Sequence, residues 1–117
     1  IMKPSRLERL EALVKEEVSD IILKMKDPRI KFVTVTDVTI SKDVKYAKIF
    51  ISIMGEEEEK KNSFSAIKGA TGFIRTELAH RLEIRRIPEL SFVLDDSIER
   101  GVRLANYIEK IVHSDES

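Results

Sequence analysis

The sequence predicts an α+β fold in which helices cover one face of a small three-stranded sheet. Two observations carry this prediction. Amphipathic helical stretches alternate along the chain with short segments rich in β-branched residues, and the apolar spacing changes between the two kinds of segment. A chain of 117 residues with 42% hydrophobic content has the size of one domain with a single core. We therefore expect one domain over residues 1–117, with its core at about 5–112 and a flexible tail at 113–117.

Residues 5–25 are expected to form the first helix. Ser5 and Glu8 have the spacing of a capping box, which marks a helix N-terminus. Apolar side chains then recur every three or four residues, at Leu7, Leu10, Val14, Val18, Ile21 and Met25. A coiled coil would use the same stripe, but Asp27-Pro28 ends it before three strict heptads are complete, which favours packing against a sheet.

Two strands are expected next, paired as an antiparallel hairpin. The segment KFVTVTDVTI is rich in β-branched residues, but its apolar positions change parity between Val35 and Val38. A bulge near Thr36–Asp37 would restore the alternation. After the turn-like stretch SKDVK, the segment YAKIFISIM alternates cleanly, so its inward residues should be Ala47, Ile49, Ile51 and Ile53.

A second helical stretch runs to about Leu82, and two glycines, Gly69 and Gly72, interrupt it. A glycine inside a helix costs about 1 kcal/mol relative to alanine, so both need a reason. One reason is a kink that Gly72 permits, which would expose the amide end of the following helix to a phosphate. The other is close packing of the helix against the sheet. The residues of this segment alone favour neither reason.

The segment LSFVLD is expected to form the third strand after the loop RRIPEL, with Leu90, Phe92 and Leu94 on one side. Asp96 and Glu99 have the spacing of another capping box, and apolar residues from Ile98 to Val112 predict a final helix. The predicted order is α-β-β-α-kink-α-β plus a C-terminal helix.

Composition argues against several classes of function. The chain has no cysteine, so it has no disulfides and no thiolate metal site, and an intracellular compartment is favoured. No apolar run approaches the ~20 residues of a membrane span. The two histidines are isolated, and phosphate-loop, metalloprotease and nucleophile-elbow motifs are absent, so we expect no enzyme, metal or cofactor. The net charge is zero, but residues 62–86 hold five basic and two acidic side chains.

The order of elements around the glycines resembles that of a type II KH domain. In KH domains a G-x-x-G loop joins two helices and lets the backbone approach nucleic-acid phosphates. Gly69-Ala70-Thr71-Gly72 matches that pattern by letter. The segment is more similar to a variant whose interhelical turn is Ala-x-Gly, so the resemblance implies a kink at Ala70, Thr71 and Gly72.

A series of short motifs resembles bacterial ribosome-binding factor A over about residues 6–112. The motifs are Asp27-Pro28-Arg29, Thr34-Val35-Thr36-x-Val38, Ser41-x-Asp43, Ala47-Lys48, Gly72-Phe73-Ile74-Arg75, Pro88-Glu89-Leu90-x-Phe92, and Asp95-x-Ser97 with Gly101. Each motif alone is weak, and their common order makes the resemblance specific.

The resemblance implies a cytoplasmic ribosome assembly factor without catalytic activity. Such a protein binds the free small (30S) ribosomal subunit and assists late maturation and 5′-end processing of its 16S rRNA, including at low temperature. An assembly GTPase and ribosomal proteins are the further partners that the resemblance implies. We expect a monomer that does not bind membranes.

We expect cationic side chains to contact RNA mainly at backbone phosphates. The first candidates are Lys68, Arg75, Arg81, Arg85 and Arg86, and the second are Lys42, Lys45 and Lys48 near the hairpin. Arg75 and Arg81 should flank the exposed side of their helix. For Arg29, RNA contact and pairing with Asp27 remain as alternatives. Phe73 and Phe92 are expected in the core, so among the aromatic residues only Phe50 is a candidate for an exposed platform, with packing at the core or edge as its alternative.

A protein-interaction module is the alternative function. In that case the aliphatic first helix and the acidic C-terminal region would dock a basic partner or self-associate. A nuclease or an rRNA-modifying enzyme would need a metal or nucleophile cluster, and the sequence offers neither.

Overall fold

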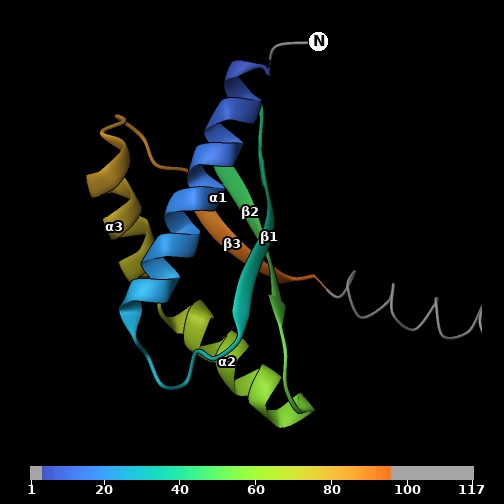
Figure 1. Ribbon diagram of the computed structural model, residues 1–117. Coiled ribbons are helices and arrows are strands. Elements are labelled where there is room, and N and C mark those ends of the chain that lie inside the picture. Colours follow the sequence, from blue (N-terminus) through green and yellow to red (C-terminus); the bar gives the residue numbers. More distant parts are fainter. Residues whose placement is uncertain (1–3, 96–117) are drawn as a thin grey trace, which may run out of the picture.

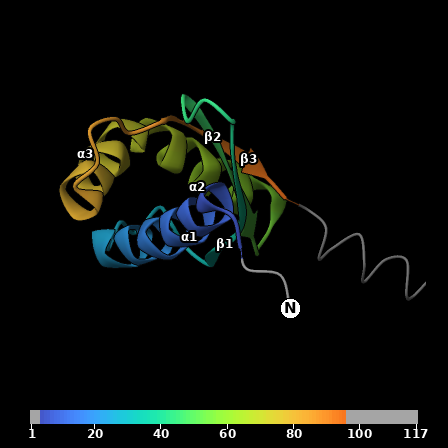
Figure 2. The same ribbon diagram turned by 90° about the horizontal axis from the view of Figure 1, so that it is seen from above.

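The computed structural model describes residues 4–95, which form the predicted α+β arrangement of three helices on a three-stranded sheet. The helices are α1 (Arg6–Met25), α2 (Glu57–Gly69) and α3 (Thr71–Leu82), and the strands are β1 (Val33–Ile40), β2 (Tyr46–Ile53) and β3 (Glu89–Leu94). All three helices lie on one side of the sheet (Figures 1 and 2). The expected C-terminal helix and tail lie outside the described residues. Within residues 4–95 no helix has both the length and the apolar character that a membrane span requires.

The central strand of the sheet is β2, which pairs with β1 antiparallel and with β3 parallel. The hairpin is thereby confirmed. The bulge is confirmed as well, because the register between β1 and β2 shifts between Val35 and Asp37. It returns Val38 and Ile40 to the core face. The four inward residues expected on β2 are all buried: Ala47, Ile49, Ile51 and Ile53.

The two phenylalanines expected in the core differ. Phe92 is buried on β3, as expected. The expectation for Phe73 is wrong, because this residue of the third helix is 54% exposed.

The core lies between the sheet and the helices. The first helix begins as expected, with the Glu8 N–H donating a 3.1 Å hydrogen bond to the Ser5 Oγ. It contributes four buried side chains, Val14, Val18, Ile21 and Ile22, and burying an aliphatic side chain of this size stabilises the fold by roughly 1.5–3 kcal/mol. The aliphatic stripe of α1 therefore packs on the sheet. The protein-interaction alternative requires this stripe to be free to dock a partner, and it is not.

A single residue, Ala70, separates α2 from α3. Its ψ of 3° departs from helical values, and its N–H donates to the carbonyl oxygens of Ala66 and Ile67, both at 3.0 Å. The expected kink is present, but its predicted extent is wrong, because Thr71 and Gly72 already belong to α3. Alanine can make this bend because its φ of −92° stays in the region open to all residues.

Neither explanation offered for the two glycines agrees with the structure. Gly72 does not adopt a positive φ, so it does not provide the bend. A Cβ built at Gly69 or Gly72 would have no heavy atom of the described chain within 4 Å, so neither glycine serves close packing. Gly55 is different, because its φ is 136° and its Cβ would lie 2.9 Å from the Glu59 Oε2. The turn before α2 thus requires a glycine, and the helical positions do not.

Alanine substitutions should separate these two kinds of glycine. Gly72→Ala should raise the free energy of unfolding by up to about 1 kcal/mol, because alanine has the higher helix propensity. Gly55→Ala should lower it by about 1–2 kcal/mol, because alanine is strained at a positive φ. Urea denaturation measures both changes, and a loss of stability in Gly72→Ala would show that the bend does need this glycine.

Candidate nucleic-acid interface

The junction of α2 and α3 presents open backbone to the solvent. Gly69 and Gly72 are exposed, and the space above each is empty of described atoms. Among the residues that the structure describes, no side chain caps the N-terminus of α3. The N-terminal end of a helix carries partial positive charge and attracts anions. A phosphate can therefore approach this backbone more closely than it can approach a helix covered by side chains.

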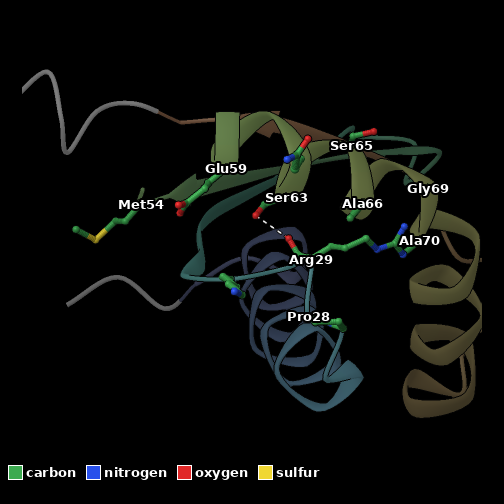
Figure 3. Close-up of a pocket in the computed structure, with 11 residues that line it drawn as sticks. Pro28, Arg29, Met54, Glu59, Ser63, Ser65, Ala66, Gly69 and Ala70 are labelled. Carbon is green, nitrogen blue, oxygen red and sulfur yellow. Dashed lines mark hydrogen bonds between the residues drawn. The ribbon is translucent and has the colours of Figure 1, made fainter. Parts of the chain in front are cut away.

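A groove of about 720 Å³ runs beside the junction, between α2 and the loop that joins α1 to β1 (Figure 3). The Ser63 hydroxyl donates a 2.8 Å hydrogen bond to the Arg29 carbonyl and so fixes this loop against α2. Both Arg29 and Lys31 line the groove, and Glu59 is the carboxylate among its described lining residues. Lys31 makes no ion pair within residues 4–95. The groove therefore offers a free cation close to the open junction.

Lys68 lies in the last turn of α2, directly before the junction. Its Nζ is 4.7 Å from the centroid of the Phe64 ring, which is a cation–π contact. The aromatic ring positions the ammonium group without neutralising it. Lys68 thus remains a candidate phosphate contact, as the sequence indicated.

Arg29 pairs with Asp27, so the pairing alternative is confirmed. Two parallel bonds join them, one of 2.8 Å from Nη2 to Oδ2 and one of 3.1 Å from Nε to Oδ1. These hydrogen bonds hold the pKa of the Asp27 carboxyl below its usual value and raise the pKa of Arg29. The Arg29 side chain is 69% exposed, so it still faces the groove, with part of its charge balanced.

Arg75 anchors the chain before β3. Its Nη2 donates a 2.9 Å hydrogen bond to the Ile87 carbonyl, and its Nε donates a 3.3 Å bond to the Pro88 carbonyl. Neutral carbonyls leave the guanidinium charge intact, and Arg75 is exposed. A shallow depression lined by Gly72, Arg75 and Ile87 continues from the junction. Arg75 therefore links α3 to the chain before β3, and it is also a candidate RNA contact.

Arg81 does not flank the exposed side of its helix, contrary to expectation. Its Nη1 lies 3.0 Å from Glu17 Oε2 and 2.6 Å from Asp20 Oδ2, and these ion pairs clamp α3 to α1. Its side chain is only 25% exposed. The hydrogen bond from Arg81 lowers the pKa of Asp20, with Lys24 adding to the effect, and the two carboxylates raise the pKa of Arg81. The structure thus removes Arg81 from the cationic surface.

The other candidate cations gather near the opposite end of β2 from the groove. The Lys45 carbonyl accepts a 2.8 Å bond from the Glu89 N–H, which joins the hairpin turn to the start of β3. The exposed cations of this region come from the hairpin, the outer face of β2 and the loop before β3: Lys42, Lys45, Lys48, Arg85 and Arg86. The candidate residues therefore form two groups, one at the groove and one at this end of the sheet.

The groove and Lys31 were not predicted from the sequence. A signal was present, because the segment KMKDPRIKF contains four basic residues in a short stretch. Two of these four cations are paired with acids in the structure, Lys24 with Asp20 and Arg29 with Asp27. The unpaired lysines become evident only when the ion pairs are assigned in three dimensions.

The element order, the bent pair of helices and the exposed junction together define a KH-like domain. The family model for ribosome-binding factor A matches residues 6–108. A ribosome-binding factor A from Dictyoglomus thermophilum is 48% identical over 113 residues, which are 95% of this chain and 94% of the relative. One from Acetivibrio thermocellus is 47% identical over 110 residues, covering 92% and 86%. The chain belongs to the ribosome-binding factor A family.

Solved structures of relatives share this fold. The solution structure of a putative ribosome-binding factor A from Thermotoga maritima has a TM-score of 0.70 at 34% identity, covering 80% of this chain and 91% of that one. The crystal structure of the Thermus thermophilus factor has a TM-score of 0.69 at 30% identity, covering 77% and 97%. The family consists of binding factors, so this chain is a binding protein and not an enzyme.

Reversing the charge of Arg81 tests its structural role. Arg81→Glu places a third carboxylate beside Glu17 and Asp20, so it should lower the melting temperature by several degrees. Arg85→Glu makes the same change in the exposed loop and should leave the melting temperature nearly unchanged. Scanning calorimetry compares the two variants, and equal melting temperatures would contradict the clamp.

The same ion pairs predict a pH dependence. The pKa of Asp20 is lower in the folded chain than in the unfolded chain, so its carboxylate stabilises the fold above the unfolded pKa of about 3.9. That stabilisation is lost as the pH falls through the folded pKa. Asp20→Asn should therefore melt below the wild type at pH 7, and the gap should narrow below about pH 4. Thermal melts across this range check the sign, and a gap independent of pH would refute it.

Proposed function

We propose that this protein is a ribosome assembly factor that binds the small ribosomal subunit through its rRNA. The observation that carries the proposal is the bent α2–α3 junction, where the backbone is open at Gly69 and Gly72 and the cation Lys68 belongs to the preceding helical turn. A Thermus thermophilus relative supports it. The model of that factor fitted into a cryo-EM map of a 30S complex has a TM-score of 0.65 at 31% identity, covering 75% of this chain and 93% of that one.

Phosphates are the groups that this surface fits best. A phosphate at the junction would meet the positive end of α3, and the strand that carries it would continue past Lys68 and along the groove past Lys31. Contacts of this kind fix the position of an RNA without reading its sequence. Because the chain has zero net charge, the attraction is local to these groups.

The exposed cations near the start of β2 and in the loop before β3 give the proposed interface a second region of contact. Arg75 connects the two regions, because it lines the depression next to Gly72 and also binds the chain before β3. Lys45, Arg85 and Arg86 would contact phosphates of a further rRNA segment. Two separated contacts would hold two rRNA segments in one relative arrangement, as an assembly factor must.

Family membership also supports a finer proposal. We propose that the protein acts on the free small subunit during late maturation and 5′-end processing of 16S rRNA, including at low temperature, in the cytoplasm. We also propose that it works as a monomeric single domain, with an assembly GTPase and ribosomal proteins as partners. None of these roles requires a catalytic group on this chain.

A negative charge at the junction should weaken binding to the small subunit. Gly72→Glu should reduce the affinity for purified subunits at least about tenfold, because it places a carboxylate where the proposal puts a phosphate. The fold should tolerate this change, since the side chain enters open space and an acidic residue suits the first turn of a helix. Co-sedimentation with subunits at two salt concentrations measures the affinity and its salt dependence.

Ala12→Glu is the matched control, because it makes the same change of charge at an exposed position of α1. This control should bind as the wild type does. Wild-type affinity in Gly72→Glu would contradict the assignment of the junction, and an affinity insensitive to salt would argue against phosphate contacts.

A further inference from the structure

An aromatic side chain is exposed immediately before β1. Phe32 is 72% exposed, and its φ of 54° lies in the left-handed region. Bulky residues rarely adopt this conformation, because the Cβ approaches the following carbonyl oxygen. The chain therefore holds a large apolar ring in the solvent on a strained backbone. Strain of this kind concentrates at functional sites.

The fold accounts for the backbone conformation but not for the ring. Ile30 and Val33 both pack against the core, so the chain must turn between them. The turn is fixed by a 3.2 Å hydrogen bond from the Met54 N–H to the Phe32 carbonyl. Glycine or asparagine would adopt the same φ with less strain. The presence of a phenyl ring at this position consequently needs a reason outside the folded chain.

The ring borders a second groove, of about 370 Å³, between the end of α1 and β1. Its apolar part includes Ile22 and Leu23, and Leu23 is 77% exposed. Lys26 also lines this groove, and its ammonium has no ion-pair partner in the described part of the chain. The carboxylate among the described lining residues, Asp27, is already bound by Arg29. An apolar surface with unbalanced positive charge thus surrounds the ring.

We propose that Phe32 is a stacking platform for an unpaired base of the RNA, with Lys26 and Lys31 contacting the flanking phosphates. This inference rests on the proposed function and extends the interface across the α1–β1 loop, because Lys31 lines the groove beside α2 and Phe32 the groove beside α1. Exposed aromatic rings flanked by cations are the usual means by which proteins bind single-stranded nucleic acids.

The charges decide between RNA and a protein segment as the occupant. An apolar peptide side chain would fit against Phe32 and Leu23, but it would leave two lysines without counter-charges. An RNA strand supplies both a flat π surface for the ring and phosphates for the ammonium groups. Single-stranded rRNA therefore matches the apolar and the charged parts of this surface together.

Substitutions at Phe32 test for stacking. Phe32→Ala and Phe32→Leu should each weaken binding to purified small subunits about tenfold, the loss expected when one base is no longer stacked. Phe32→Tyr keeps the aromatic face and should bind as the wild type does. Phe32→Gly should melt no lower than the wild type, which shows that the ring is dispensable for folding. Leu13→Ala removes an exposed apolar side chain that lines neither groove and should leave binding unchanged.

A fluorescence experiment probes the base directly. The chain has no tryptophan, so Phe32→Trp introduces a single indole at the platform. Its emission should be quenched by a single-stranded RNA oligonucleotide of mixed sequence and not by the same sequence as a duplex, whose bases are stacked on one another. Absence of quenching by the single strand would overturn the proposal.

The outcomes separate this inference from the proposed function. Wild-type affinity in Phe32→Leu, together with weakened binding in Phe32→Ala, would overturn stacking and indicate an apolar protein contact. Wild-type affinity in Phe32→Ala, together with lost binding in Gly72→Glu, would overturn the platform and leave the proposed function in place. Failure of the wild-type chain to bind small subunits would contradict the proposed function itself, and the stacking inference would fall with it.

Discussion

The bend at Ala70 determines how the helices cover the sheet. A straight helix over residues 57–82 would be about 39 Å long, whereas a strand of eight residues spans about 26 Å. The bend lets α2 and α3 bury Ile67 and Leu78 in one core and brings Arg81 to the carboxylates of α1. The exposed junction is thus a product of core packing.

Hydrogen bonds and an ion pair hold the loop between α1 and β1 in place, although the loop has no regular secondary structure. It is secured at one end by the pair of Arg29 with Asp27, in its middle by the bond from Ser63 to the Arg29 carbonyl, and at its end by the bond from Met54 to Phe32. The first of these contacts lies within the loop, and the other two join the loop to α2 and to the residue that follows β2. In the proposed interface, a loop held in this way would present its cationic and aromatic groups in a fixed arrangement, which would reduce the entropy lost on binding.

Sequence patterns predicted the elements well because each has a local signal. Strict alternation placed the inward residues of β2, and the change of parity between Val35 and Val38 located the bulge. Two features had no such signal. The carboxylates that bind Arg81 lie more than 60 residues away along the chain. The exposure of Phe32 depends on a left-handed backbone that a strand-like sequence does not reveal. Local sequence patterns therefore could not predict ion pairs between residues distant in the chain or the backbone conformation of a single residue.

The empty space above Gly72 has a consequence for the evolution and engineering of this chain. A protein selected only for resistance to heat would fill that position, since a methyl group there meets no obstacle and strengthens the helix. A glycine at position 72 lowers the thermostability of the chain, although the fold does not require a glycine there. Redesign that optimises the melting temperature alone would replace this glycine, and under the proposed function the more stable variant would bind its RNA less well.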